Sequence, residues 1–125
     1  MKKLPKISES EWLVMQVLWS KSPLTANDIV KQLTGKTRWK PRTIKTLINR
    51  LAKKKAVKFE KEGRRYRYYP AVSESKCVRT ETRSFLRRVY RGATRPMLAA
   101  FLEDAELSPD EIEELKKILE KKGKK

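Results

Sequence analysis

The hydrophobic pattern changes its period near Ala56, and this change restricts the fold of the chain more than any other feature does. Before Ala56, apolar residues recur every three or four positions over three segments, which is typical of short helices that share one core. From Val57 to Tyr69, apolar and charged residues alternate on both sides of Gly63. A period of two around a glycine predicts two strands joined by a tight turn.

Each of the three helical segments has a start signal. Ser8 and Thr25 are each followed, three residues later, by an acidic residue, Glu11 and Asp28, which is the spacing of a capping box. Pro41 stands where the first turn of a helix tolerates proline. We therefore expect helices over residues 8–20, 25–35 and 41–51, and the apolar stripe of the third helix is Ile44, Leu47, Ile48 and Leu51.

Three short helices followed directly by a hairpin predict a mainly α fold, a winged helix-turn-helix with a small two-stranded hairpin. The stretch from Pro70 to Val72 indicates a boundary, and beyond it the pattern predicts three further helices. We therefore expect two domains, a winged-helix domain over residues 1–72 and an all-α three-helix domain over residues 73–125.

The charge of the chain indicates a partner rich in phosphate. Lys and Arg number 32 and Asp and Glu number 15, which gives a formal net charge of +17. Residues 1–72 hold 19 basic and 5 acidic residues, a net charge of +14, whereas residues 73–125 hold 13 and 10, a net charge of +3. A positive charge of this size favours nucleic acid as the binding partner, with an anionic membrane surface as the second candidate. The winged-helix domain is therefore expected to bind DNA.

Opposite its apolar stripe, the third helix carries a polar face. Arg and Asn can form bidentate bonds to guanine and adenine, Thr can offer a methyl group to thymine, and Lys can only neutralise phosphate. The alternative is that these charged residues only keep the outer face of the helix solvated and bind nothing. The basic hairpin that follows argues against this alternative. The helix face holds Arg42, Lys45, Thr46, Asn49 and Lys53, flanked by Thr43 and Arg50, and the hairpin adds Arg64, Arg65 and Arg67 as phosphate contacts.

The second domain is predicted to form a homodimer. Three amphipathic helices are too few to close a core of their own, so their apolar stripes are expected to pack against a second copy. The residues expected at this interface are Val78, Phe85, Leu86, Val89, Leu98, Phe101, Leu102, Ile112, Leu115 and Leu119.

The composition argues against most enzyme chemistry. The chain has no histidine and one cysteine, Cys77, so the sequence offers no Cys/His metal cluster, no disulfide and no histidine-based catalytic pair. We expect no metal, no cofactor and no catalytic residue. The longest apolar run, Met97 to Leu102, is far shorter than a membrane-spanning helix, and no export signal is evident. A cytoplasmic protein without membrane insertion is therefore expected.

The third helix also resembles the recognition helix of the penicillinase repressors, the BlaI/MecI family. Residues 39–47 read Trp-Lys-Pro-Arg-Thr-Ile-Lys-Thr-Leu and are followed by Arg50-Leu51 and Lys53-Lys54, which is similar to the signature of that helix. The resemblance covers nearly the whole chain. It extends to Glu11 and to residues 14–15, 17–19, 61–64, 84–86, 90–92, 101–103 and 107–108.

The resemblance implies a homodimeric repressor that binds an inverted-repeat operator and is inactivated when a membrane-bound sensor protease signals a β-lactam antibiotic. It implies that Thr43, Thr46 and Arg50 read the operator. Ala100-Phe101 stands where the family has a scissile Asn-Phe pair, so this bond is a candidate cleavage site, and whether it is cut stays open. The tail lacks the cysteine cluster of copper-responsive relatives, which excludes copper sensing of that type.

One local departure concerns the end of the third helix. Lys55 stands where the family commonly has glycine, and a lysine in a left-handed cap costs about 1 kcal/mol or more. We therefore expect this helix to end differently, which leaves the position of the wing open.

Together these observations predict a sequence-specific transcriptional repressor that binds a palindromic operator in double-stranded DNA as a homodimer. The repressor is expected to be of the β-lactamase (penicillinase) repressor type, and we further expect it to be inactivated by proteolysis. The alternative is a basic winged-helix module that has an architectural or protein-interaction role and no specific operator.

Overall fold

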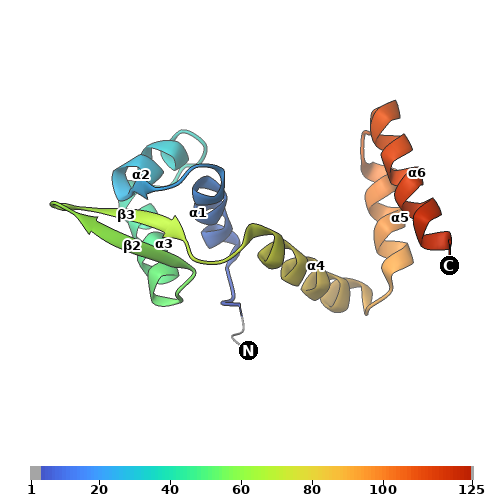
Figure 1. The fold of residues 1–125 in the computed structure, drawn as a ribbon, viewed down its shortest axis with the longest axis horizontal. Helices are drawn as coiled ribbons and strands as arrows, with labels where there is room; N and C mark the ends of the chain where they lie inside the picture. Colours follow the sequence, from blue (N-terminus) through green and yellow to red (C-terminus); the bar gives the residue numbers. More distant parts are fainter. Residues whose placement is uncertain (1–3, 125) are drawn as a thin grey trace. The chain divides into compact units, whose positions relative to one another are not determined.

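Residues 4–124 are described by a computed structural model (Figure 1). The described chain folds into helices and short strands in the order α1 (Glu9–Ser20), β1 (Leu24–Thr25), α2 (Ala26–Thr34), α3 (Pro41–Lys53), β2 (Val57–Glu62), β3 (Arg65–Pro70), α4 (Glu74–Tyr90), α5 (Thr94–Asp104) and α6 (Pro109–Gly123). This is the predicted class, a mainly helical winged helix.

The helices begin where the cap signals predicted. The Ser8 amide donates to Glu11 Oε1 at 2.9 Å, and the Glu11 amide donates back to Ser8 Oγ at 3.3 Å. The same reciprocal pair joins Thr25 and Asp28 at the start of α2, and Pro41 occupies the first turn of α3. Because each capping box satisfies amides that have no partner within the helix, it fixes the residue at which the helix starts.

The prediction that α3 would end differently from a glycine-capped helix is wrong. Lys55 adopts the left-handed conformation, with φ of 65°. The Lys55 amide donates to Ala52 O at 3.1 Å and the Ala56 amide to Leu51 O at 3.0 Å, which is the Schellman pattern. Ala56 and Leu51 are both fully buried, so the packing of the chain beyond the cap holds Lys55 in a conformation that costs about 1 kcal/mol.

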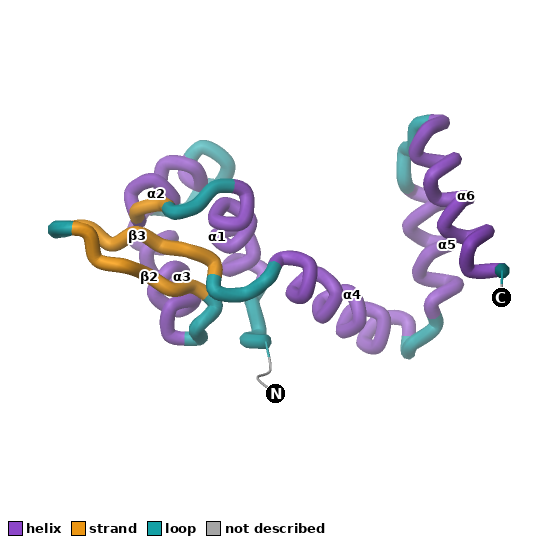
Figure 2. Tube along the Cα trace, in the orientation of Figure 1, coloured by secondary structure: helices purple, strands orange, loops and turns teal. Residues whose placement is uncertain are grey.

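The hairpin is present as predicted, but it belongs to a sheet of three strands rather than two (Figure 2). The strand order is β1-β3-β2, and both pairs are antiparallel. Leu24 pairs with Tyr68 and Thr25 with Arg67. β1 was missed because its two residues are too few to show an alternation. The turn of the hairpin consists of Gly63 and Arg64, and Gly63 has φ of 63°, which explains a glycine there.

One hydrophobic core lies within the winged helix. It gathers the apolar stripes of α1, α2 and α3, and Trp12 and Trp19 pack at its margin with their ring centroids 5.5 Å apart. Trp19 also donates from Nε1 to Val72 O at 3.0 Å. The fully or almost fully buried members include Val14, Met15, Leu18, Ile29, Leu33, Ile44, Ile48 and Leu51.

The chain divides into two compact units, Met1–Glu81 and Thr82–Lys125. The first unit reaches past Val72 because the start of α4 contributes Cys77, 4% exposed, to the core of the winged helix. Within the second unit, Phe85 of α4 stacks on Phe101 of α5 with their ring centroids 5.9 Å apart, and Met97 is buried.

Candidate nucleic-acid interface

The rotation of α3 about its axis is fixed by its apolar stripe. Ile44, Leu47, Ile48 and Leu51 are at most 5% exposed and pack into the core. The opposite face therefore points outward, and the structure brings the predicted residues together there. All seven are exposed: Arg42, Thr43, Lys45, Thr46, Asn49, Arg50 and Lys53.

This face combines side chains that can recognise bases with side chains that can neutralise phosphate. Thr46 donates its hydroxyl to Arg42 O at 3.0 Å, so the methyl group and the oxygen lone pairs remain for a base. Arg50 and Asn49 carry the donors and acceptors that recognise guanine and adenine edges, while Lys45 offers charge alone. The face therefore has the chemistry needed for direct reading in a major groove.

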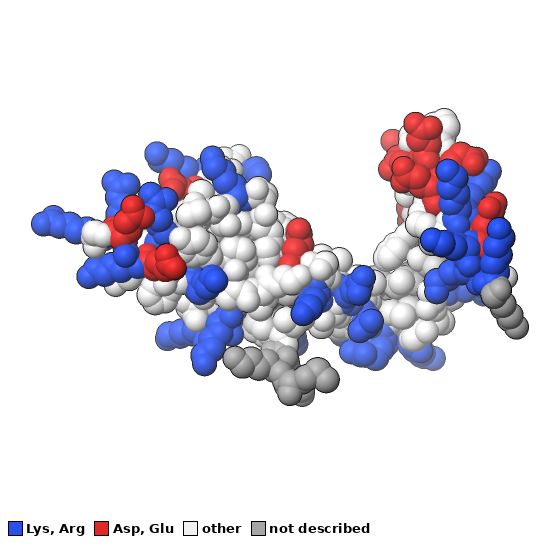
Figure 3. Space-filling model, viewed as in Figure 1, with Lys and Arg blue, Asp and Glu red and all other residues white. Residues whose placement is uncertain are grey.

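The hairpin of β2 and β3 is the wing beside this helix. Arg64 lies in its turn and Arg65 begins the returning strand, and both side chains are exposed. Basic side chains gather at the tip of the hairpin in Figure 3. Arg67 differs from the other two because it forms an ion pair with Glu62 across the hairpin. Arg64 and Arg65 are thus better placed than Arg67 to neutralise phosphate.

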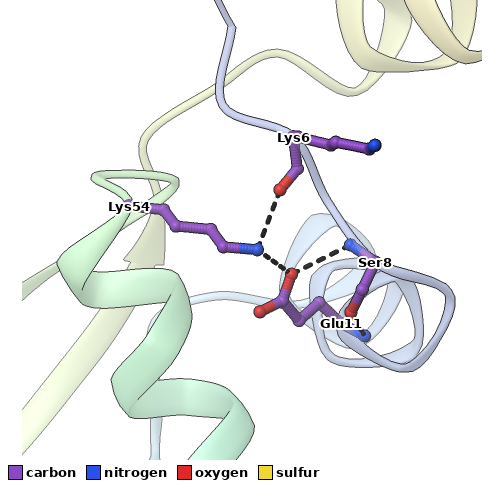
Figure 4. Close-up of polar contacts among 4 residues, drawn as sticks. All are labelled: Lys6, Ser8, Glu11 and Lys54. Carbon is purple, nitrogen blue, oxygen red and sulfur yellow. Dashed lines mark hydrogen bonds and ion pairs between the residues drawn. The ribbon is translucent and has the colours of Figure 1, made fainter.

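Lys54 has a structural role that the sequence pattern did not indicate (Figure 4). Its Nζ lies 2.5 Å from Glu11 Oε1 and donates to Lys6 O at 2.9 Å. Glu11 is 1% exposed, and burial acts to raise its pKa. Hydrogen bonds from Lys54 and Ser8 outweigh that effect and hold the pKa of Glu11 below its usual value. Lys54 therefore ties the end of α3 to the start of α1.

Most of the predicted dimer residues of the second unit are apolar side chains that are exposed to solvent. Six of its side chains, in α4, α5 and α6, are between 40% and 59% exposed, and Ile118 joins them although the sequence reasoning did not name it. Phe85, Leu86 and Leu115 are half-buried, while Val78, in the first unit, is 46% exposed. The six are Val89, Leu98, Phe101, Leu102, Ile112 and Leu119.

The bond between Ala100 and Phe101 lies inside α5. Ala100 is half-buried and Phe101 is 50% exposed. Because a protease binds its substrate in an extended conformation, α5 must unwind locally before this bond can be cut.

Three further features of the described part of the chain concern metal ligands, membrane-spanning helices and the cysteine. Residues 4–124 contain no group of three or more Cys, Asp or Glu side chains arranged to hold a metal ion. No helix in that range is long and apolar enough to cross a membrane. Cys77 is buried, and burial raises the pKa of its thiol, which disfavours the reactive thiolate.

A helix-turn-helix core, a polar outward face on its third helix and a basic hairpin next to it define a winged-helix DNA-binding protein. The family model of the penicillinase repressors matches residues 7–121. The penicillinase repressor of Bacillus licheniformis is 43% identical over 120 residues, which cover 96% of this chain and 94% of that protein. The methicillin resistance regulatory protein MecI of Staphylococcus aureus is 39% identical over 117 residues, covering 94% and 95%. The chain belongs to the penicillinase repressor family.

Solved structures agree with this assignment. The solution structure of the DNA-binding domain of the repressor BlaI is 44% identical, covers 60% of this chain and 92% of that one, and has a TM-score of 0.54. A complex of the monomeric form of Bacillus licheniformis BlaI with the blaP half-operator has the same coverage and a TM-score of 0.53. The transcription regulator MepR, 24% identical, shares the fold over 93% of this chain, with a TM-score of 0.54. The chain is thus a DNA-binding repressor of the BlaI type.

Proposed function

We propose that this chain represses transcription by binding a palindromic operator as a homodimer, and that β-lactam antibiotic relieves the repression through proteolysis. The observation that carries the proposal is the outward face of α3, fixed in rotation by a buried stripe and placed next to a basic wing. The BlaI structure with a half-operator supports it, because that relative binds DNA with a domain of the same fold. The site of action is the cytoplasm, where the DNA lies.

In this proposal the contacts divide into two groups. Thr43, Thr46 and Arg50 read base edges in the major groove, as the resemblance to the penicillinase repressors implies, and Thr and Arg side chains can distinguish bases there. The remaining residues neutralise phosphate or support the docking, and Arg67 does so less because of its pair with Glu62. The supporting residues are Arg42, Lys45, Asn49, Lys53, Arg64, Arg65 and Arg67.

The homodimer follows from the apolar surface of the second unit. Half-exposed Leu, Ile, Val and Phe side chains on α4, α5 and α6 lose contact with water when a second copy covers them. Two copies present two α3 helices, so the operator half-sites should lie about one helical turn of DNA apart, or a multiple of it.

In this proposal, proteolysis relieves repression by disrupting the dimer interface of the second unit. Cleavage between Ala100 and Phe101 by a membrane-bound sensor protease would separate α6 from the rest of the chain and remove half of the interface. Loss of the dimer weakens DNA binding because each monomer then has one half-site contact. Mass spectrometry of the protein from induced and uninduced cells tests this step. An intact chain under full induction would rule it out.

Selection of DNA sequences with the purified full-length protein tests the proposed function itself. We expect one enriched palindrome, bound about 1,000-fold or more tighter than random DNA at physiological salt. If random duplex competes as well as the enriched sequence, the protein is a basic architectural module and the repressor proposal fails.

A further inference from the structure

A hollow opens between α2 and the centre strand of the sheet, on a part of the surface to which the proposed DNA contacts contribute only Arg65. β1 ends at Thr25, which pairs with Arg67, so β3 continues toward the tip of the hairpin without a partner strand on this side. The open edge of β3 leaves a space beside α2. Polar and aromatic side chains line that space, among them Asn27, Lys31, Arg65, Tyr66 and Tyr68.

The α2 side of the hollow offers a cation. Asn27 and Lys31 are four residues apart, so they share one face of the helix, and both are exposed. Asp28 also lines the hollow, but its carboxylate accepts the Thr25 amide at 3.1 Å as part of the cap. Hydrogen bonds from Thr25 hold the pKa of Asp28 below its usual value, so it stays ionised. Lys31 and Arg65 against Asp28 leave the hollow with a net positive charge.

The wing side offers a hydroxyl group. The ring of Tyr66 packs edge-on against Phe59, with centroids 5.2 Å apart, so the ring is held in place although it is 43% exposed. Within residues 4–124, no hydrogen-bond partner of the Tyr66 hydroxyl is observed. Tyr69 provides a contrast, because its hydroxyl donates to Glu60 at 3.3 Å. Tyr66 and Tyr69 are three residues apart on one strand and therefore lie on opposite faces of the hairpin.

We propose that this hollow seats one phosphate group of the DNA backbone. Lys31 and Arg65 neutralise its charge, and the Tyr66 hydroxyl donates a hydrogen bond to one of its oxygens, which are the two kinds of donor that phosphate accepts in protein–DNA complexes. The inference rests on the proposed function, since the wing must lie along DNA for a phosphate to enter. It extends the DNA-binding surface from α3 and the wing to α2.

The test measures the affinity of the full-length protein for a short random-sequence duplex by fluorescence anisotropy at rising salt. Random DNA suffices because every duplex carries the same phosphates. Lys31→Gln should reduce the slope of log K against log salt by about 0.9, the effect of one phosphate contact. Tyr66→Phe should weaken binding about tenfold and leave the slope unchanged, because it removes a donor but no charge.

Matched controls lie on the opposite face of the hairpin. Lys58→Gln and Tyr69→Phe change the same residue types outside the hollow, and both should bind nearly as the parent protein does. The proposal is overturned if Lys31→Gln and Lys58→Gln reduce the slope equally, or if Tyr66→Phe binds as tightly as the parent. Tryptophan fluorescence confirms that each variant is folded, and Tyr66→Phe, which keeps the packed ring, decides the matter if Lys31→Gln is unstable.

Failure of this inference is distinct from failure of the proposed function. Normal discrimination of the selected operator together with unaffected Lys31→Gln and Tyr66→Phe variants refutes the phosphate seat and leaves the repressor proposal standing. If the parent protein does not distinguish the operator from random DNA, but both variants weaken binding to random DNA as predicted, the repressor proposal fails and the phosphate seat stands.

Discussion

Lys54 Nζ lies 2.5 Å from Glu11 Oε1, although 43 residues separate the two in the sequence. The side chain of Glu11 is 2% exposed, whereas that of Lys54 is 36% exposed. The buried carboxylate therefore needs the lysine as a partner, whereas the half-exposed lysine can also be hydrated by water. The contact holds the end of α3 against the capping box of α1.

Lys54→Met should destabilise the winged helix, because it leaves the Glu11 carboxylate buried without its cation. We expect the free energy of unfolding to fall by about 2 kcal/mol, less than for a fully buried pair because water reaches Lys54. Urea unfolding followed by tryptophan fluorescence measures this, and all three tryptophans lie in the first unit. Lys53→Met, an exposed change on the same helix, is the control, and an equal loss there would refute the role of the pair.

The same contact predicts a dependence of stability on pH. The pKa of Glu11 is lower in the folded protein than its ordinary value of 4.5. A carboxyl group with a depressed pKa stabilises the fold above its unfolded pKa, and that contribution is lost as pH falls through the folded pKa. The free energy of unfolding should therefore drop below about pH 4.5. Glu11→Gln should show a shallower drop in urea unfolding measured from neutral to acidic pH. An identical pH profile in that variant would contradict the prediction.

A substitution of Lys55 is predicted to raise the stability of the fold, in contrast to the substitution of Lys54. Its φ of 65° strains a residue with a Cβ atom, and glycine adopts this conformation without that strain. Lys55→Gly should therefore stabilise the winged helix by about 1 kcal/mol. Lys53→Gly, two residues earlier in the α-helical conformation, should instead destabilise it by about 1 kcal/mol. Thermal unfolding of both variants checks the signs, and a loss of stability in Lys55→Gly would show that the lysine side chain contributes more than its backbone costs.

The contrast between Lys54 and Lys55 shows how far the sequence could predict this fold. Capping boxes, the apolar stripe of α3 and the hairpin around Gly63 were predicted because their signals lie within a few residues of one another. The pairing of Lys54 with Glu11 has no local signal, since it depends on how α1 packs against α3. Lys55 was misjudged for a related reason, because long-range burial of Ala56 outweighs a local backbone cost. The exposed face of α3 followed from the stripe, whereas the hollow beside Tyr66 depends on where β1 ends.

Single substitutions on α3 and the wing should separate base reading from phosphate contact. Arg50→Ala and Thr46→Ala should each cost about 1 to 3 kcal/mol on the operator and relax the preference for it over random DNA. Arg65→Ala should weaken binding to both duplexes alike and reduce the salt slope. The measurement is a parallel titration of operator and random duplex. If Arg50→Ala weakens both equally, Arg50 contacts the backbone instead.

The last prediction concerns the proposed dimer, because half-exposed apolar side chains of the second unit would lose contact with water in it. Leu119 is 59% exposed on α6 and carries no polar group that would favour this exposure. Leu119→Glu would place a charge in the interface, so it should shift the protein from dimer to monomer at micromolar concentration in analytical ultracentrifugation, and weaken operator binding. Leu13→Glu is the matched control, since Leu13 is 37% exposed on α1, in the other unit, and this variant should remain a dimer. A parent protein that sediments as a monomer would refute the dimer. A dimer that survives Leu119→Glu and is lost in Leu13→Glu would instead place the interface on the winged helix.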